Sequence, residues 1–153
     1  LLCLNQNSSE IMIRKKIFTL VVVASSLFAS AQQKPIKLPK EATTFLETHF
    51  NGIAINEIKK ETEGTSFKYE VTLQNGSEIE FNSRGRWKEL ESKTTSLPVS
   101  MLQAIVGEYI LKTYPSAKIT EIKKGARFNF VELNDETLLQ FDTEGNFYRI
   151  MPQ

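Results

Sequence analysis

The chain has 153 residues, a formal net charge of +1 and 41% hydrophobic residues, which is typical of a globular protein. This composition excludes a long disordered or fibrous repeat, and it lacks the basic surplus with which proteins bind nucleic acid.

The N-terminal part has the pattern of a secretory signal peptide. A basic cluster at 14–16 precedes an almost unbroken apolar run at 17–28, and small residues at 29–31 form a cleavage site. The run is shorter than the roughly 20 residues of a membrane span, although an uncleaved anchor stays an open alternative. We expect residues 1–11 to be an upstream extension of the reading frame before Met12, and residues 12–31 to be the signal peptide.

The expected mature protein consists of a tail at 32–37 and one domain at 38–153. Cleavage after Ala31 removes Cys3, the single cysteine, so no disulfide or thiolate ligand remains and no lipid-bearing cysteine follows the cleavage site. We therefore expect a periplasmic or secreted protein without a membrane anchor.

The first half of the domain predicts one helix and a four-stranded meander. Ala42, Phe45, Leu46 and Phe50 form one apolar helical stripe. Strand-like runs follow at about 53–60, 66–74, 77–82 and 86–91. The sequence Asn75-Gly76 predicts a two-residue hairpin, and Asn82-Ser83-Arg84-Gly85 predicts a type I turn with a left-handed glycine.

The second half begins after a short polar linker at 92–96. Pro98 is expected to open a helix that Pro115 ends. Its apolar stripe consists of Leu102, Ile105, Val106, Tyr109 and Ile110. Four strand-like runs follow as in the first half, but Asp135-Glu136 replaces Asn75-Gly76, so that hairpin is expected to be less tight or more strained.

Several short motifs occur twice in the same order, which predicts an internal duplication of residues 38–91 and 97–151. The matched pairs are Leu38-Pro39 with Leu97-Pro98, Glu57-Ile58-Lys59-Lys60 with Glu121-Ile122-Lys123-Lys124, Val71-Thr72-Leu73 with Val131-Glu132-Leu133, and Phe81 to Gly85 with Phe141 to Gly145. We expect one α+β domain in which helices cover one face of an antiparallel sheet of up to eight strands.

These motifs resemble the PepSY-like family of exported bacterial proteins, whose members are also described as beta-lactamase-inhibitor-like. The resemblance rests on Glu-Ile-Lys-Lys, Tyr-Glu-Val-Thr-Leu, Asn-Gly, Ile-Glu-Phe and Asn-x-x-Gly-x-Trp in the first copy, and on Phe141 to Phe147 in the second. It implies a tandem fold of the beta-lactamase-inhibitor type with an open sheet face for a protein partner. It implies no catalytic residues, and a shared fold does not by itself fix function.

The residues also argue against catalysis. His49 is the only histidine, which argues against Ser–His pairs and multi-histidine metal centres. Because His49 lies beside the apolar stripe of the first helix, we expect it to be partly buried. The acidic residues alternate with apolar ones or occupy turns, so we expect no enzyme activity, no cofactor and no metal site.

One difference between the copies predicts a binding surface. Lys68 and Glu70 correspond to Phe128 and Phe130, and strand alternation points both phenylalanines away from the helix. Leu138 shares that direction. The predicted patch consists of Phe128, Phe130 and Leu138, joined by Phe147 and Trp87 and flanked by Lys68, Glu70 and Arg127.

We therefore expect a non-catalytic exported protein that captures or inhibits a protein or peptide in the cell envelope through the open sheet face. The alternative is a structural or accessory domain that self-associates through its sheet, for example as a homodimer. The patch could also be covered by the tail at 32–37, by a loop or by a second copy.

Overall fold

The computed structural model describes residues 35–152. The predicted upstream extension, the signal peptide and the start of the tail lie outside this range. The elements in chain order are α1 (Lys40–His49), β1 (Ile55–Glu63), β2 (Ser66–Leu73), β3 (Ser77–Asn82), β4 (Trp87–Ser92), η1 (Val99–Met101), α2 (Ala104–Thr113), β5 (Ile119–Lys124), β6 (Phe128–Leu133), β7 (Leu138–Asp142) and β8 (Phe147–Ile150).

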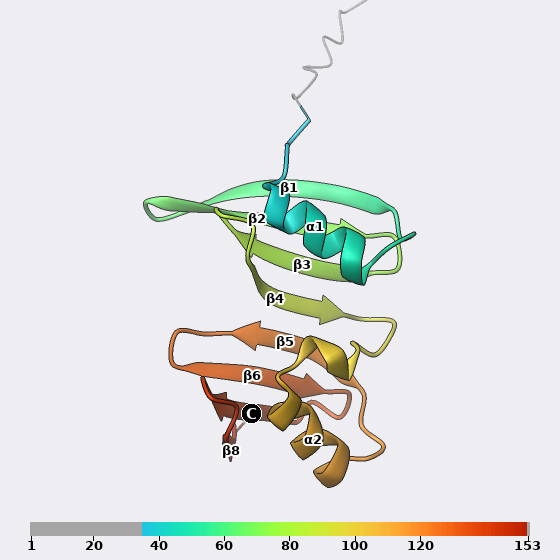
Figure 1. Ribbon diagram of the computed structural model, residues 1–153, viewed down its shortest axis with the longest axis vertical. Helices are drawn as coiled ribbons and strands as arrows, with labels where there is room; N and C mark the ends of the chain where they lie inside the picture. Colours follow the sequence, from blue (N-terminus) through green and yellow to red (C-terminus); the bar gives the residue numbers. More distant parts are fainter. Residues whose placement is uncertain (1–34, 153) are drawn as a thin grey trace, which may run out of the picture. The chain divides into compact units, whose positions relative to one another are not determined.

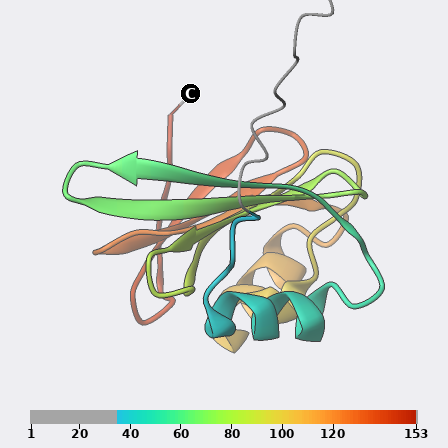
Figure 2. The same ribbon diagram turned by 90° about the horizontal axis from the view of Figure 1, so that it is seen from above.

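The eight strands form one sheet in the order β1-β2-β3-β4-β5-β6-β7-β8, and every neighbouring pair is antiparallel. Both α-helices lie on the same face of this sheet, and no helix formed by residues 35–152 lies on the opposite face (Figures 1 and 2). The predicted α+β class and the placement of the helices are therefore confirmed. Among residues 35–152, no helix is long and apolar enough to cross a membrane.

The two halves share strand register as well as element order. The pairs Lys68–Asn82 and Thr72–Glu78 of β2–β3 recur as Phe128–Asp142 and Glu132–Leu138 of β6–β7. Bulges recur as well, because both β3–β4 and β7–β8 shift register opposite the same repeated position. Identical strand offsets are what a duplicated sequence produces, although common ancestry of the halves stays a prediction.

The turns after β3 and β7 have the predicted left-handed glycines. Gly85 has φ +88° and Gly145 has φ +94°, and each amide donates to the carbonyl three residues earlier. Gly85 also lies against Pro39 and Gly145 against Ile105, so a side chain at either glycine would collide with the start of a helix. Each turn therefore holds the sheet close to its own helix.

Two local predictions were wrong. The loop at Asn75-Gly76 is longer than two residues, because the Gly76 amide donates to Leu73 O and only Gly76 has positive φ. Pro98 opens the 3-10 turn η1 instead of α2, and the extended backbone at Leu102 interrupts the helical path before α2 begins at Ala104. The strained hairpin predicted in the second half does occur, because Glu136 has φ +66° where the first half has Gly76.

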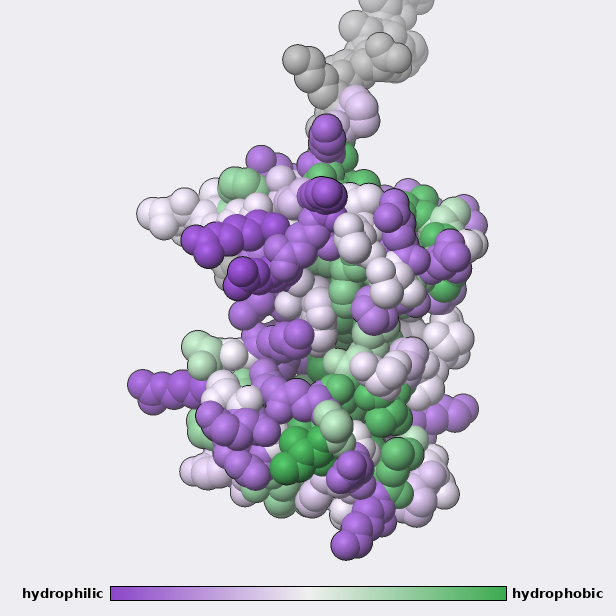
Figure 3. Space-filling view, viewed as in Figure 1, coloured by the Kyte–Doolittle hydropathy of each residue, from purple (hydrophilic) through white to green (hydrophobic). Residues whose placement is uncertain are grey.

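The interrupted segment leaves apolar surface on the helix-covered side. Figure 3 shows hydrophobic atoms gathered over η1 and α2 on this side. A hollow of about 220 Å³ opens there and is lined in part by Trp87, Met101, Leu102 and Val106.

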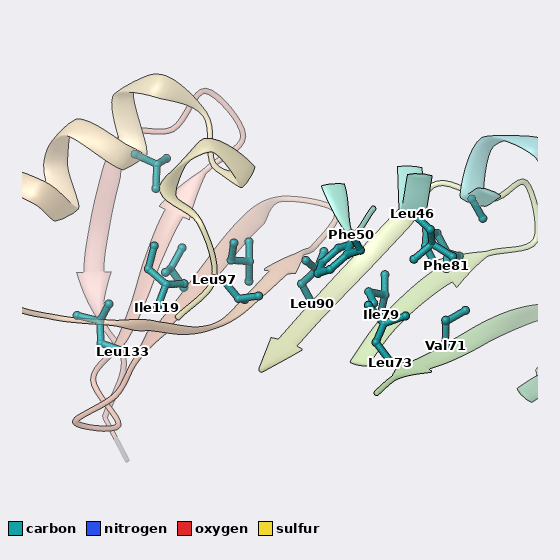
Figure 4. Packing of buried hydrophobic residues seen from close by; sticks show 14 of the residues in the cluster. Leu46, Phe50, Val71, Leu73, Ile79, Phe81, Leu90, Leu97, Ile119 and Leu133 are labelled. Atoms are coloured by element: carbon teal, nitrogen blue, oxygen red, sulfur yellow. The ribbon is translucent and has the colours of Figure 1, made fainter. Parts of the chain in front are cut away.

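The hydrophobic core lies between the helices and the sheet and runs through both halves. The inner strands contribute alternate residues to it, such as Val71 and Leu73 in β2, because side chains of a strand alternate between faces. Leu90 and Leu97 fill the junction between the halves and are 0% and 3% exposed (Figure 4). We call this β4–β5 junction the seam. One continuous core explains why the polar linker does not separate two domains.

Candidate binding face of the sheet

The sheet face opposite the helices is the candidate site, and we call it the open face. In β6, Val131 and Leu133 are buried under the helix layer, each 1% exposed. Phe128 and Phe130 alternate with them and therefore project from the open face, as predicted. Both rings are half-buried.

Four side chains with large apolar parts lie on the open face in β6, β7 and β8, and we call them the aromatic cluster: Phe128, Phe130, Leu138 and Tyr148. The rings of Phe128 and Tyr148 are 5.0 Å apart between centroids, and Tyr148 is 59% exposed. Beside them Arg149 Nε donates to Gln140 Oε1 at 2.8 Å, and Gln140 is buried. Gln140 stands directly opposite Phe130, so the cluster combines apolar side chains with a polar pair among them.

Tyr148 was missed by sequence reasoning, and the expected positions of Trp87 and Phe147 on the open face were wrong. The Phe147 ring stacks on Tyr109 of α2 at 4.7 Å, and the Trp87 ring lies 5.9 Å from Phe45 of α1. The cause is the bulge in β4 and β8, where one extra residue reverses the alternation of side chains. The same bulge turns Tyr148 toward the open face.

Lys68 and Glu70 lie on the open face but do not flank the aromatic cluster. They belong to β2, and three strands separate β2 from β6. At roughly 4.8 Å between neighbouring strands, that places them about 19 Å from the phenylalanines. Lys68 instead forms ion pairs with Glu80 at 2.5 Å and Glu61 at 3.9 Å. Arg127 is exposed in the β5–β6 turn, next in sequence to the cluster.

The repeated lysine pairs divide between the two faces. The first lysine of each pair faces the open side, where Lys59 contacts Glu70 at 3.0 Å and Lys123 contacts Glu89 at 2.5 Å. The second lysine of each pair points to the helix side and lies over an aromatic ring, as Lys124 does over Trp87 at 3.4 Å. Because carboxylates and rings engage them, these lysines do not form an anion-binding patch.

Acidic residues dominate the middle of the open face. Glu78, Glu91, Glu121 and Glu132 stand opposite one another on the successive strands β3, β4, β5 and β6, and we call them the glutamate row. Lys93 approaches one end of the row, 3.4 Å from Glu78. Like charges in directly opposed positions repel, so the row concentrates negative potential beside the aromatic cluster.

Glu121 shows the electrostatic consequence of this crowding. Burial, followed by the nearby negative charge of Glu89, raises the pKa of Glu121 from 4.5 to about 7, although Lys123 opposes the shift. Glu89 and Glu121 lie on opposite sides of the seam. The negative charge at the centre of the open face therefore increases as the pH rises through neutrality.

The single histidine and the acidic residues are arranged as follows. His49 is exposed at the end of α1, contrary to the expected partial burial, and its ring lies 4.6 Å from the Phe45 ring on the helix-covered side. Among residues 35–152, no group of three or more His, Cys, Asp or Glu side chains is arranged to hold a metal ion. The chemistry that the open face offers is contact through apolar rings and carboxylates.

Comparisons with known proteins agree with this fold. The family model described as "Putative beta-lactamase-inhibitor-like, PepSY-like" matches residues 67–149. A solved structure from Bacteroides thetaiotaomicron, described as a putative calcium-regulated periplasmic protein, is 33% identical; the match covers 78% of this chain and 96% of that one, with a TM-score of 0.73.

Two solved structures from Bacteroides vulgatus are also similar. One, described as a putative periplasmic protein of unknown function, is 28% identical over 76% of this chain and 93% of its own, with a TM-score of 0.73. The other, described as a putative periplasmic protein, is 30% identical over 80% of this chain and 99% of its own, with a TM-score of 0.72. No curated protein matches the chain. The chain belongs to the PepSY-like, beta-lactamase-inhibitor-like family.

Proposed function

We propose that the protein is a non-catalytic binding module that captures a protein or peptide partner on the open face. The observation that carries this proposal is the aromatic cluster, in which Phe128, Phe130 and Tyr148 lie on the sheet face that no helix covers. Aromatic side chains supply most of the binding energy in many protein interfaces, and contiguous apolar surface on a soluble protein usually marks such an interface.

The surroundings of the cluster define the chemistry of the partner. The glutamate row adjoins the cluster, since Glu132 of the row stands opposite Leu138 of the cluster. A fitting partner therefore presents an apolar anchor for the rings and basic side chains for the carboxylates. Complementary charge of this kind mainly raises the association rate and selects among partners, while the aromatic contact supplies most of the affinity.

The predicted signal peptide and the periplasmic description of the related structures support a location outside the cytoplasm. One of those structures is described as calcium-regulated. A divalent cation would reduce the repulsion within the glutamate row, so calcium concentration is a variable in the binding experiment. For this chain the effect of calcium is a proposal that rests on the carboxylates of the open face.

The test is affinity capture from cell-envelope extract with three immobilised proteins: wild type, a Phe128→Ser/Phe130→Ser variant and a Leu111→Ser control. Leu111 is 57% exposed on α2, so the control removes an apolar side chain of the helix-covered side. We expect the same partner with wild type and the control, and its loss with the double variant, each with and without calcium.

Thermal unfolding of the three proteins separates binding from stability. If the double variant unfolds at a much lower temperature than the control yet still captures the partner, the two rings belong to the core and the proposal fails. If it keeps its stability and loses the partner, the rings act in binding. Partner released from wild type by basic peptides would further support the role of the glutamate row.

A further inference from the structure

The two ends of the sheet are edge strands that resemble the two sides of the seam. Within the described residues, β1 pairs only with β2 and β8 only with β7, so each exposes unpaired backbone groups. β8 pairs with β7 in the same register in which β4 pairs with β3, and β1 pairs with β2 as β5 pairs with β6. β8 is therefore the counterpart of β4, and β1 is the counterpart of β5. The seam itself is the contact β4–β5. The pairing of β4 with β5 inside the chain therefore shows a geometry in which β8 of one copy could pair with β1 of another.

Residues that are buried at the seam have exposed counterparts at the ends. Leu90 of β4 is 0% exposed, whereas its counterpart Ile150 of β8 is 54% exposed. Ile119 of β5 is 2% exposed, whereas its counterpart Ile55 of β1 is 43% exposed. Such differences are expected when one apolar contact is made inside the chain and the equivalent contact at its ends is left open.

The β1 end also has space for an incoming side chain. A groove of about 390 Å³ lies between α1 and the start of β1 and is lined mainly by apolar residues, among them Leu46, Phe50, Ile55, Ile58 and Leu73. At the seam the equivalent position is closed by β4 and by the linker, where the Leu97 amide donates to Ile119 O at 2.8 Å.

We infer that the β8 edge of one copy pairs with the β1 edge of a second copy in the register of the seam. The seam pair Leu90–Ile122 becomes Ile150 opposite Ile58, which places Ile150 over the groove. The contact uses different surfaces on the two molecules, so it is head-to-tail and can continue beyond a dimer. It uses backbone groups of the two edge strands and not the rings of Phe128 and Phe130, so it can be tested separately from the proposed partner capture.

One position sets the strength of this contact. At the seam Glu89 faces Lys123 and the two form an ion pair at 2.5 Å. The same register places Arg149 opposite Lys59 between copies, and both are cations. Like charges in directly opposed positions weaken strand pairing, so the wild-type association is weak and becomes stronger as salt screens the repulsion.

The test is sedimentation velocity of the purified protein over a wide concentration range. Arg149→Glu restores the acid–base pair of the seam. Lys59→Glu restores it with the charges exchanged, and because it also removes the ion pairs of Lys59 with Glu57 and Glu70, thermal unfolding of this variant is measured alongside. Each single variant is expected to tighten self-association roughly fivefold, and the double variant, which again opposes two like charges, is expected to return to the wild-type level. Ile150→Asp is expected to abolish association.

Two control variants show whether a change in self-association is specific to the sheet edges. Arg84→Glu makes the same charge change on an exposed turn residue and is expected to leave association unchanged. Phe128→Ser/Phe130→Ser is expected to leave it unchanged too, which separates this contact from partner capture. The inference is overturned if both single variants sediment as wild type, or if the double variant associates as tightly as the single ones.

Discussion

Replacing Glu121 by Gln is expected to change how the stability of the protein depends on pH. In the folded protein, burial and the charge of Glu89 raise the pKa of Glu121 from 4.5 to about 7. A raised carboxyl pKa means that the folded state holds a proton that the unfolded state has already released. Stability therefore falls as the pH rises through this interval, and the loss is complete above the folded pKa.

The size of the effect follows from the shift. The whole difference in the pKa of Glu121 between the unfolded and folded states corresponds to about 3 kcal/mol in the free energy of unfolding. The side chain is only half-buried and its charged neighbours are partly exposed, so solvent screening reduces the expected loss to ~1 kcal/mol. Glu121→Gln removes the ionisation and is expected to be more stable than wild type by that amount above neutral pH, with little difference in mild acid.

Urea unfolding followed by circular dichroism, at several pH values between about 5 and 8, measures this difference. Glu108→Gln, on the exposed surface of α2, is the matched control for loss of one negative charge and is expected to follow wild type. Parallel curves of unfolding free energy against pH for wild type and Glu121→Gln would refute the electrostatic account of the open face.

Three further substitutions test the architecture, each by the free energy of unfolding. Glu136→Gly relieves a left-handed residue at φ +66° and is expected to stabilise the protein by about 0.5 kcal/mol, and an unchanged or lower value would contradict this. Leu90→Ala opens a cavity at the fully buried seam and is expected to cost about 3 kcal/mol, and a loss below about 1 kcal/mol would mean that the halves do not share a core. Gly85→Ala is expected to cost at least ~1 kcal/mol, because its φ is +88° and its new Cβ would lie 2.8 Å from Pro39; an isoenergetic variant would show that α1 moves freely.

Much of the fold could be predicted from the sequence because its signals are local. Alternation in β2 and β6 gave the buried face of each strand, and the turns ending in Gly85 and Gly145 fixed two hairpins. The direction of Phe128 and Phe130 followed from the same alternation. The strain at Glu136 could be foreseen because the equivalent turn in the other half has glycine.

The wrong predictions for Trp87 and Phe147, and the missed closeness of Glu89 and Glu121, come from structural features that leave no pattern in the sequence. The bulge in β4 and β8 adds one residue and reverses the side-chain direction, so Trp87 and Phe147 face the helices and Tyr148 faces the other way. Pairing across the seam is a contact between distant segments, so the closeness of Glu89 and Glu121 could not be inferred from spacing.

Partner capture on the open face requires that the surface is accessible at Phe128, and thiol labelling measures this accessibility directly. Protein lacking residues 1–31 contains no native cysteine, so single Phe128→Cys and Val131→Cys variants report one site each. We expect rapid alkylation of the Phe128→Cys variant in the folded protein, and alkylation of the Val131→Cys variant only on unfolding. Equal protection at both positions would contradict it, because a face covered in solution cannot receive a partner.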